Sequence, residues 1–277
     1  MIDNNEIKNE LIEGRNAVIE ALRAGRAIDK IFIARGDVDK TLGHIASKAR
    51  EKGIVVVESD RRKLDFMSQT KAHQGVIAVC AVRDYCSIED ILALAAERGE
   101  PPFVIVCDEI SDPHNLGAII RTAECVGAHG VVIPKRRSAG LTAIVDKASA
   151  GAAEHMLIAR VANLPAAIKT LKDNGLWIYG TAAGGQNGLW TTDFTGALAL
   201  VIGSEGDGMG RLVAESCDFI VSLPMKGQDS HEGQAQFPQR QRRRRDNHVR
   251  DTQTAHGLNR GETSPTFFST VGGLHIQ

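Results

Sequence analysis

The sequence feature that most constrains the fold is the alternation of apolar and polar segments over residues 103–133. Residues 103–107 are nearly all apolar and of strand length, which is typical of a strand buried on both faces. The proline after Asp112 disfavours a helical conformation at Asp112, and Asn115 lies where a helix would begin. Residues 131–133 are again apolar. The pattern predicts a strand–loop–helix–strand unit of an open α/β sheet, in which ligands bind beyond the carboxyl ends of the strands.

The turn and the helix admit a structural and a functional interpretation. An Asp-Pro-x-Asn turn is a good helix cap by itself, and a single Arg121 is more often solvated than catalytic. The run from Asp112 to Ala123, however, reads Asp-Pro-x-Asn-Leu-Gly-Ala-x-x-Arg-Thr-Ala. It resembles the first signature of the SpoU/TrmH family of RNA 2′-O-ribose methyltransferases. Residues 197–209, an apolar run that ends in Gly-Ser-Glu-Gly-Asp-Gly-Met, resemble the second signature, and the resemblance extends from about residue 12 to residue 227.

The composition indicates the cellular compartment of the protein and limits the kind of RNA site that it can have. The 277 residues, 43% of them hydrophobic, can bury one or two cores, and two is the better expectation. The formal net charge of −1 means that an RNA site must be a local basic patch. Five scattered cysteines without a Cys-x-x-Cys pair argue against a metal site and against disulfides, and they fit a reducing cytoplasm. No apolar run approaches the ~20 residues that span a bilayer, and the start of the chain is unlike a signal peptide.

The chain divides into segments of different character. Residues 1–83 predict a small α/β domain that resembles the substrate-binding domain of the family, whose fold is similar to an RNA-binding ribosomal protein. In it, Arg15 and His73 are candidate RNA contacts, although both are also compatible with a purely structural role in turns. Residues 84–102 are predicted as a linker and residues 103–228 as the catalytic domain.

Two loops of the second domain carry further candidates. Residues 134–138 form a basic loop after a strand, and Lys135 and Arg136 are the candidate phosphate contacts in it. Thr181 and Ala182 follow another strand, at a place where family members approach the cofactor adenosine. The glycine-rich run of residues 203–208 in the second signature is not a dinucleotide-binding fingerprint, because Ser204 and Glu205 interrupt its glycines.

The resemblance implies a chemistry. Family members transfer a methyl group from S-adenosylmethionine to a ribose 2′-hydroxyl, a reaction that needs positioning and removal of a proton, and no metal. By resemblance, Asn115, Arg121 and Glu205 line the reacting centre. Arginine stays protonated in proteins, so Arg121 would orient the hydroxyl or hold a phosphate. The cofactor-binding candidates are Thr181, Ala182, Gly203, Ile220 and Leu223.

The resemblance also implies a fold and an assembly. The expected class is α/β, with the small RNA-binding domain followed by a parallel-sheet SPOUT domain. Family members close that domain with a C-terminal trefoil knot, which is expected to be incomplete here, and they are typically homodimers. The expected partner is RNA, rRNA more than tRNA. Two alternatives remain: a non-catalytic RNA-binding module that keeps the fold, and a nucleotide-binding enzyme of another class. Titration with S-adenosylmethionine distinguishes them.

The resemblance stops after about Gln228. Residues 229–277 lack helical or strand periodicity and are predicted to be disordered by composition. Four consecutive arginines, 242–245, would suit an RNA-binding arm, but a second interpretation is preferred. When the codons of residues 236–246 are read from their second base, they can encode Asn-Ser-Leu-Asn-Ala-Ser-Val-Ala-Ala-Ala-Ile, the missing third family signature. The sequence therefore predicts a frameshift near residue 228 in the gene or in its sequencing.

Overall fold

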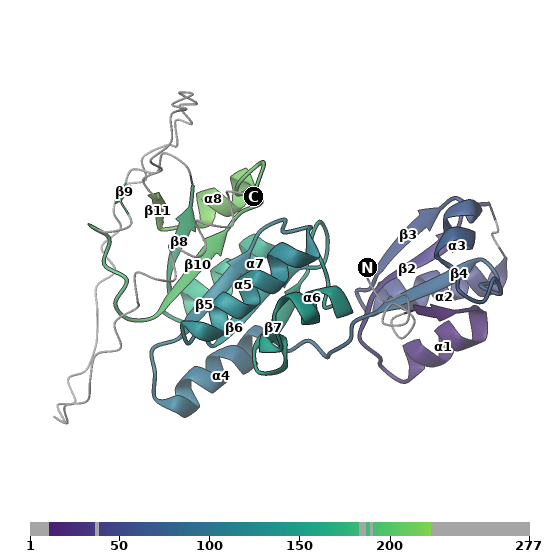
Figure 1. The fold of residues 1–277 in the computed structure, drawn as a ribbon, viewed down its shortest axis with the longest axis horizontal. Coiled ribbons are helices and arrows are strands. Elements are labelled where there is room, and N and C mark those ends of the chain that lie inside the picture. The colour runs from purple at the N-terminus through teal and green to yellow at the C-terminus, as the bar shows by residue number, and fades with distance from the viewer. Residues whose placement is uncertain (1–10, 37–38, 183–186, 189–190, 223–277) are drawn as a thin grey trace.

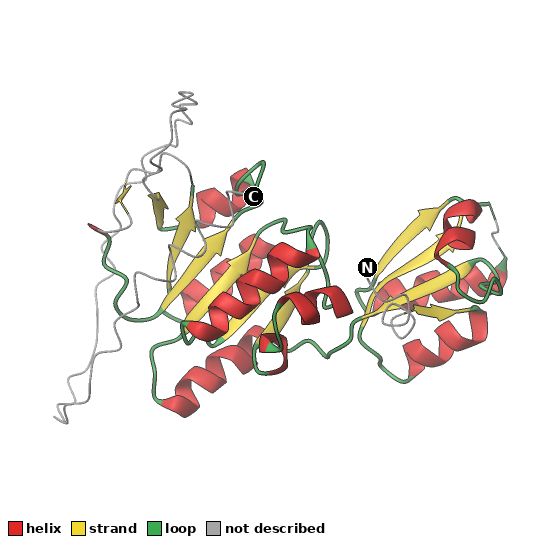
Figure 2. Cartoon of the chain, viewed as in Figure 1, coloured by secondary structure: helices red, strands yellow, loops and turns green. Residues whose placement is uncertain are grey.

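The computed structural model describes residues 11–36, 39–182, 187–188 and 191–222, which form two β-sheets (Figure 1). Figure 2 shows helices lying beside the strands of both sheets. The four-stranded sheet comes from the first part of the chain and the seven-stranded sheet from the rest. The predicted α/β class, a small mixed sheet followed by a parallel sheet, is confirmed.

The four-stranded sheet has the order β1-β4-β2-β3. Its strands are β1 (Leu11–Glu13), β2 (Ile28–Ala34), β3 (Val55–Ser59) and β4 (Val76–Cys80), and its helices are α1 (Arg15–Arg23), α2 (Lys40–Glu51) and α3 (Arg61–Met67). β4 is antiparallel to β1 and to β2, whereas β3 is parallel to β2. Side chains alternate along β2: Ile31 and Ile33 share a core with α1 and α2, and Phe32 shares one with Leu64 of α3. Both faces of this sheet are therefore covered.

The seven-stranded sheet has the order β7-β6-β5-β10-β8-β11-β9, and every paired neighbour is parallel. Its strands are β5 (Phe103–Cys107), β6 (Gly130–Pro134), β7 (Leu157–Val161), β8 (Trp177–Thr181), β9 (Asn187–Gly188), β10 (Leu198–Ile202) and β11 (Phe219–Ser222). Its helices are α4 (Ile88–Arg98), α5 (Pro113–Cys125), α6 (Ala143–Ala148), α7 (Leu164–Asp173) and α8 (Arg211–Ser216), with the short 3-10 helix η2 (Ala152–Glu154).

Helices cover both faces of the larger sheet, which explains its apolar strands. Ile105 and Cys107 of β5 share a core with α5 and α6, while Val104 and Val106 share one with α4, α7 and α8. Strands buried on both faces need apolar side chains at successive positions, as residues 103–107 have. Each fully buried aliphatic side chain contributes about 1.5–3 kcal/mol to folding.

The order in which the chain adds strands to the sheet reverses beside β5, although all the strands stay parallel. From β5 the chain adds β6 and then β7 on one side, whereas β10, β8 and β11 lie on the other side. β5 and β10 are therefore the two neighbours at the topological switch point, where α/β sheets open a crevice beyond the strand ends. The segments that follow these two strands carry the signature residues.

Several predicted elements are confirmed and several were missed. The strand predicted at 103–107 is found with the same bounds as β5, but β1, β9, α6 and α8 were not predicted. Within residues 84–102, predicted as a linker, α4 contributes Ile88 and Ile91 to the core of the larger sheet. The tail and the expected knot lie outside the described residues. Within the described ranges, no helix has the length and apolar character needed to span a bilayer.

Candidate active site

The turn between β5 and α5 is shaped by its own sequence. Asp112 is the N-cap of α5, and its carboxylate accepts a hydrogen bond of 2.7 Å from the backbone N–H of His114. Pro113 occupies the first helical turn, where its missing N–H costs no intrahelical hydrogen bond. Asn115 consequently lies in the first turn of α5, at the carboxyl edge of the sheet.

The glycine-rich segment after β10 folds back on itself. The backbone N–H of Ser204 donates to the carbonyl of Gly208 at 2.9 Å, and the N–H of Gly208 donates to the carbonyl of Ser204 at 3.0 Å. Gly208 has a φ of 68°, which glycine adopts without strain. A Cβ on Gly203 would lie 2.2 Å from the carbonyl carbon of Gly208, so only glycine fits there. The resulting tight loop carries Glu205.

Gly203→Ala is expected to open this loop. The added methyl group would meet backbone atoms, which cannot rotate away as a side chain can, so we expect a loss of about 1–3 kcal/mol in the free energy of unfolding. Urea denaturation followed by tryptophan fluorescence measures it. Gly206→Ala is the matched control, because a Cβ on Gly206 meets nothing within 4 Å. Equal losses in the two variants would show that the loop does not depend on the close approach at Gly203.

The two loops meet through a side-chain hydrogen bond. Asn115 Nδ2 donates to Glu205 Oε2 at 3.3 Å, which joins residues 90 positions apart in the chain. Asn115 is half-buried and Glu205 is exposed, so the pair borders solvent. The structure thus brings two of the three predicted catalytic residues together at the topological switch point.

Arg121 lies on the same helix but on another side of it. At 3.6 residues per turn, six residues turn the direction by about 600°, which leaves Arg121 about 120° away from Asn115 around the helix. Its side chain is exposed, and within the part of the chain that the structure describes it forms no hydrogen bond or ion pair with Asn115 or Glu205. Its place in the reacting centre stays a prediction.

Most of the predicted cofactor residues end three adjacent strands. The hydroxyl of Thr181 donates to the carbonyl of Val201 at 3.0 Å, and the N–H of Ala182 donates to the carbonyl of Val221 at 3.0 Å. These bonds hold the carboxyl ends of β8, β10 and β11 in register. Leu223 lies outside the described residues. Thr181, Ala182 and Gly203 lie at these strand ends, whereas Ile220 is the second residue of β11.

This edge fits an adenosine-bearing cofactor. All four residues are partly accessible, and all are small or apolar. Adenine and ribose bind chiefly through apolar contacts and backbone groups, and the carboxyl edge of a parallel sheet is where such ligands bind. No ionised side chain among the four would have to be desolvated.

Asp108 supports the glycine-rich loop and was missed as a functional residue. It follows β5 directly, is only 4% exposed, and accepts a hydrogen bond of 2.7 Å from the N–H of Gly210. Its own N–H donates to the carbonyl of Ile202 at 2.8 Å. Burial, together with the charge of Glu109, raises the pKa of the Asp108 carboxyl despite the hydrogen bond from Gly210. The available signal was an acid placed directly after an all-apolar strand, where a buried carboxylate needs a partner.

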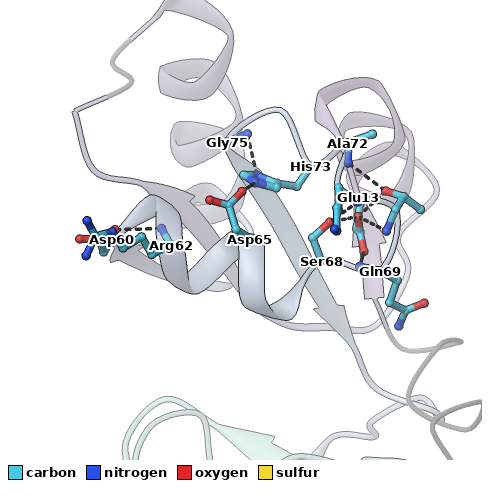
Figure 3. Close-up of polar contacts among 11 residues, drawn as sticks. Glu13, Asp60, Arg62, Asp65, Ser68, Gln69, Ala72, His73 and Gly75 are labelled. Carbon is cyan, nitrogen blue, oxygen red and sulfur yellow. Dashed lines mark hydrogen bonds and ion pairs between the residues drawn. The ribbon is translucent and has the colours of Figure 1, made fainter.

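In the smaller sheet, residues 68–75 form a loop organised around Glu13 (Figure 3). The Glu13 carboxylate accepts hydrogen bonds from the hydroxyl of Ser68 at 2.7 Å, the N–H of Gln69 at 2.6 Å and the hydroxyl of Thr70 at 2.5 Å. Partial burial alone would raise the pKa of Glu13, but the hydrogen bonds from Thr70, Gln69 and Ser68 hold it below its usual value. The loop is therefore well anchored to β1.

His73 occupies the interior of that loop. Its ring is 2% exposed, its Nδ1 accepts from the N–H of Gly75 at 3.0 Å, and its Nε2 lies 2.9 Å from Asp65 (Figure 3). Because Nδ1 is an acceptor, Nε2 carries the proton and donates to Asp65. Both ring nitrogens are thus engaged within the loop, and the ring does not lie on the surface in this structure.

Arg15, the other predicted RNA contact of this domain, lies beside the same loop. Its Nε donates to the carbonyl of Gln74 at 3.0 Å, and it forms an ion pair with Asp39. The side chain keeps 30% of its surface exposed. A guanidinium with unused donors on an exposed turn suits a phosphate contact, which remains a prediction.

The two basic residues after β6 differ in their surroundings. Lys135 Nζ donates to the carbonyl of Gly53 at 3.0 Å and so links this loop to the smaller sheet. Arg136 is exposed and, among the described residues, has no hydrogen-bond or ion-pair partner. Arg136 is consequently the freer of the two for an anionic ligand. Across the described ranges there is also no group of three or more His, Cys, Asp or Glu that could hold a metal ion.

Comparison with known proteins finds two family matches in the chain. Residues 102–230 match the SpoU rRNA Methylase family, and residues 11–86 match the RNA 2′-O ribose methyltransferase substrate binding family. YacO of Bacillus subtilis (strain 168), assigned by name to the TrmH family of tRNA/rRNA methyltransferases, is 46% identical over 220 residues. That alignment covers 79% of this chain and 88% of YacO. The chain belongs to the SpoU/TrmH family.

Other SpoU/TrmH proteins align over a similar length. A relative from Staphylococcus aureus (strain MSSA476) with the same family assignment is 42% identical over 221 residues, which are 80% of this chain and 89% of the relative. Among solved structures, an AdoMet-bound rRNA methyltransferase from Sinorhizobium meliloti is 23% identical, with a TM-score of 0.46, and the match covers 79% of each chain.

Proposed function

We propose that the protein, in its intact reading frame, transfers a methyl group from S-adenosylmethionine to a ribose 2′-hydroxyl of structured RNA. The observation that supports this best is the Asn115–Glu205 pair at the topological switch point, inside the segment matched to the SpoU rRNA Methylase family. That family description favours rRNA over tRNA as the substrate. The substrate-binding match over residues 11–86 favours the smaller sheet as the first RNA contact.

The residues of this chain have separable tasks in that reaction. Arg121, which stays protonated, orients the 2′-hydroxyl and stabilises the negative charge that develops on its oxygen. Glu205 fixes the amide of Asn115 through Oε2, and its other carboxylate oxygen, which has no partner among the described residues, is available to the substrate. Holding the reacting groups in this way supplies the positioning that methyl transfer needs.

The cofactor would be held at the ends of β8, β10 and β11. When bound, S-adenosylmethionine supplies a methyl group on a positively charged sulfur. Thr181, Ala182, Gly203 and Ile220 would bind its adenosine through backbone and apolar contacts, and we extend the same role to Leu223. Asp108 would keep the glycine-rich loop closed beside it by holding the N–H of Gly210.

A shifted reading frame explains why the family resemblance ends abruptly. The match to the SpoU rRNA Methylase family stops at residue 230, close to the predicted frameshift. The hidden reading of residues 236–246 supplies Asn and Ser side chains in the order of the third signature. The arginines at 242–245 are then a by-product of Ala- and Val-rich codons. The chain as written would lack part of its cofactor site.

The proposed oligomeric state rests on the family to which the chain belongs, and the proposed cellular location rests on its cysteines. We infer a homodimer of the intact protein, formed through the catalytic domain as in family members. We place it in the cytoplasm, where the five free cysteines, Cys80, Cys86, Cys107, Cys125 and Cys217, stay reduced.

A non-catalytic RNA-binding module is the alternative that must be tested. Isothermal titration of the frame-restored protein with S-adenosylmethionine distinguishes the two. The proposal predicts saturable binding at one site per chain, and a pure RNA-binding module predicts none. Binding that persists in a Gly203→Ala variant with an opened loop would argue against the site at the ends of β8, β10 and β11.

Arg136→Ala is expected to weaken RNA binding uniformly across sequences. Loss of one phosphate contact should reduce the slope of log K against log salt concentration by about one for duplex RNA, because fewer counterions are released. Filter binding at several salt concentrations measures the slope. Arg98→Ala is the matched control, since this exposed arginine ends α4 and is not one of the predicted RNA contacts. An unchanged slope in Arg136→Ala would remove the basic loop from the RNA site.

A further inference from the structure

A buried polar cluster joins the two sheets. Asp29, at the start of β2, forms an ion pair with Arg160 of β7, and the two side chains are only 2% and 6% exposed. The hydroxyl of Tyr85, in the connecting segment, donates to the same Asp29 carboxylate at 2.7 Å and accepts the N–H of Leu141 at 3.0 Å. The Arg160 guanidinium also lies over the Tyr85 ring, 5.1 Å from its centroid. One carboxylate from the smaller sheet thus binds Arg160 of the larger sheet and Tyr85 of the connecting segment.

The backbone around the cluster leaves space for the Asp29 carboxylate and fixes the segments on both sides of it. A Cβ on Gly140 would lie 1.7 Å from Asp29 Oδ2, so the carboxylate occupies the space of a missing side chain. Arg160 also donates through Nη2 to the carbonyl of Lys135 at 3.3 Å. Backbone hydrogen bonds from Val82 to Leu141 and from Cys86 to Ile158 fasten the connecting segment on both sides of Tyr85. Desolvated charges at a junction are costly unless paired, so the pair disfavours any other arrangement of the two sheets.

The cluster lies next to the predicted RNA-binding loop. Arg160 is near the carboxyl end of β7, and the carbonyl that it holds belongs to Lys135, which directly follows β6. Lys135 in turn contacts Gly53 of the smaller sheet. Arg136, the exposed basic residue, is therefore flanked by groups fixed to both sheets.

We infer that Asp29, Arg160 and Tyr85 form a latch that sets the angle between the RNA-binding sheet and the carboxyl edge of the catalytic sheet. This inference rests on the proposed function, because the angle matters for delivering a bound ribose to the reacting centre. Asp29 and Arg160 are positioning residues: they act on RNA through the geometry of the two sheets and touch neither substrate nor cofactor. A flexible junction would have to be ordered each time RNA contacts both sheets, and that cost in conformational entropy would weaken the binding of RNA.

A distance measurement on the full chain tests the latch without relying on catalysis. One spin label goes on Cys125 of α5, the exposed native cysteine, and a second on Arg23→Cys in α1, where the arginine side chain is 72% exposed. The other native cysteines are buried or half-buried, and burial raises the thiol pKa of Cys107 and Cys217 to about 12, so they label slowly at neutral pH. Electron–electron double resonance then reports the distribution of distances between the two sheets.

The test variant removes both charges together. Asp29→Leu is combined with Arg160→Met so that no single charge stays buried. An unpaired buried charge would destabilise the junction whether or not the pair sets the angle between the sheets. We expect the protein to stay folded, the distance distribution to widen at least twofold, and the KM for RNA in the frame-restored protein to rise roughly tenfold with unchanged affinity for S-adenosylmethionine. The control removes the exposed Lys169–Asp173 pair of α7 by alanine substitution, and it should change neither the distances nor the KM.

The outcomes separate the latch from the proposed activity. An unchanged, narrow distance distribution in the double variant overturns the latch, whatever the activity. A widened distribution with an unchanged KM overturns the positioning role. If the distribution widens but no version of the protein transfers methyl groups, the latch stands as a device that orients the RNA-binding sheet and the proposed function fails.

Discussion

Arg121→Ala, made in the frame-restored protein, is expected to lower the rate of methyl transfer roughly 100-fold or more, the effect of removing one preorganised donor from a developing oxyanion. The affinity for S-adenosylmethionine should change little, because the cofactor candidates lie on β8, β10 and β11 and Arg121 lies on α5. Single-turnover kinetics and calorimetric titration measure the two quantities separately.

A neighbouring charge on the same helix provides the control for Arg121. Glu124→Ala alters another exposed residue of α5 and should leave the rate within about twofold, as expected for a surface side chain with no polar partner among the described residues. Equal losses of rate and of cofactor affinity in Arg121→Ala would indicate a structural role instead. Loss of RNA binding with a normal rate at saturating RNA would assign the guanidinium to a phosphate.

Restoring the reading frame after Gln228 is expected to have the second large effect. Under the frameshift proposal, this chain lacks the Asn- and Ser-bearing third signature and the helix that follows it, and with them part of the proposed cofactor site. We expect at least roughly 100-fold weaker binding of S-adenosylmethionine than in the restored protein, since several contacts of about 1–1.5 kcal/mol each are lost. Titration of both proteins under one set of conditions gives the ratio.

A truncation separates the loss of the proper sequence from an effect of the substituted one. If the shifted tail contributes nothing, the chain ended after Gln228 should bind the cofactor as weakly as the chain as written. Stronger binding by the truncated chain would mean that the tail interferes. Methyl transfer by the chain as written at the rate of the restored protein would contradict the frameshift account.

The elements that could be predicted are those with a strong local signal. The strand at 103–107 has a continuous apolar run, and the start of α5 is encoded by the Asp112–Pro113 pair. β1 has three residues and no periodicity, and α6 lies in a segment of small residues, so neither stands out from its surroundings. Tertiary pairing, rather than local propensity, determines both.

The contacts of the site that could be predicted are those between residues of recognisable motifs. The family resemblance predicted that Asn115 and Glu205 lie together, and in the structure their motifs follow the neighbouring strands β5 and β10. The Asp29–Arg160 pair joins residues 131 positions apart, and neither residue stands in a recognisable motif. The burial of His73 was equally hidden, because a histidine in a turn gives no sign of which way its ring points.

The central claim is tested most directly by the product of the reaction. The frame-restored protein is incubated with rRNA transcripts and S-adenosylmethionine that carries a labelled methyl group, and the RNA is digested to nucleosides for mass spectrometry. The account predicts the label on the ribose of one 2′-O-methylnucleoside, with labelling roughly 100-fold slower or more for Arg121→Ala. Label on a base, or no transfer to any RNA despite cofactor binding, would contradict it.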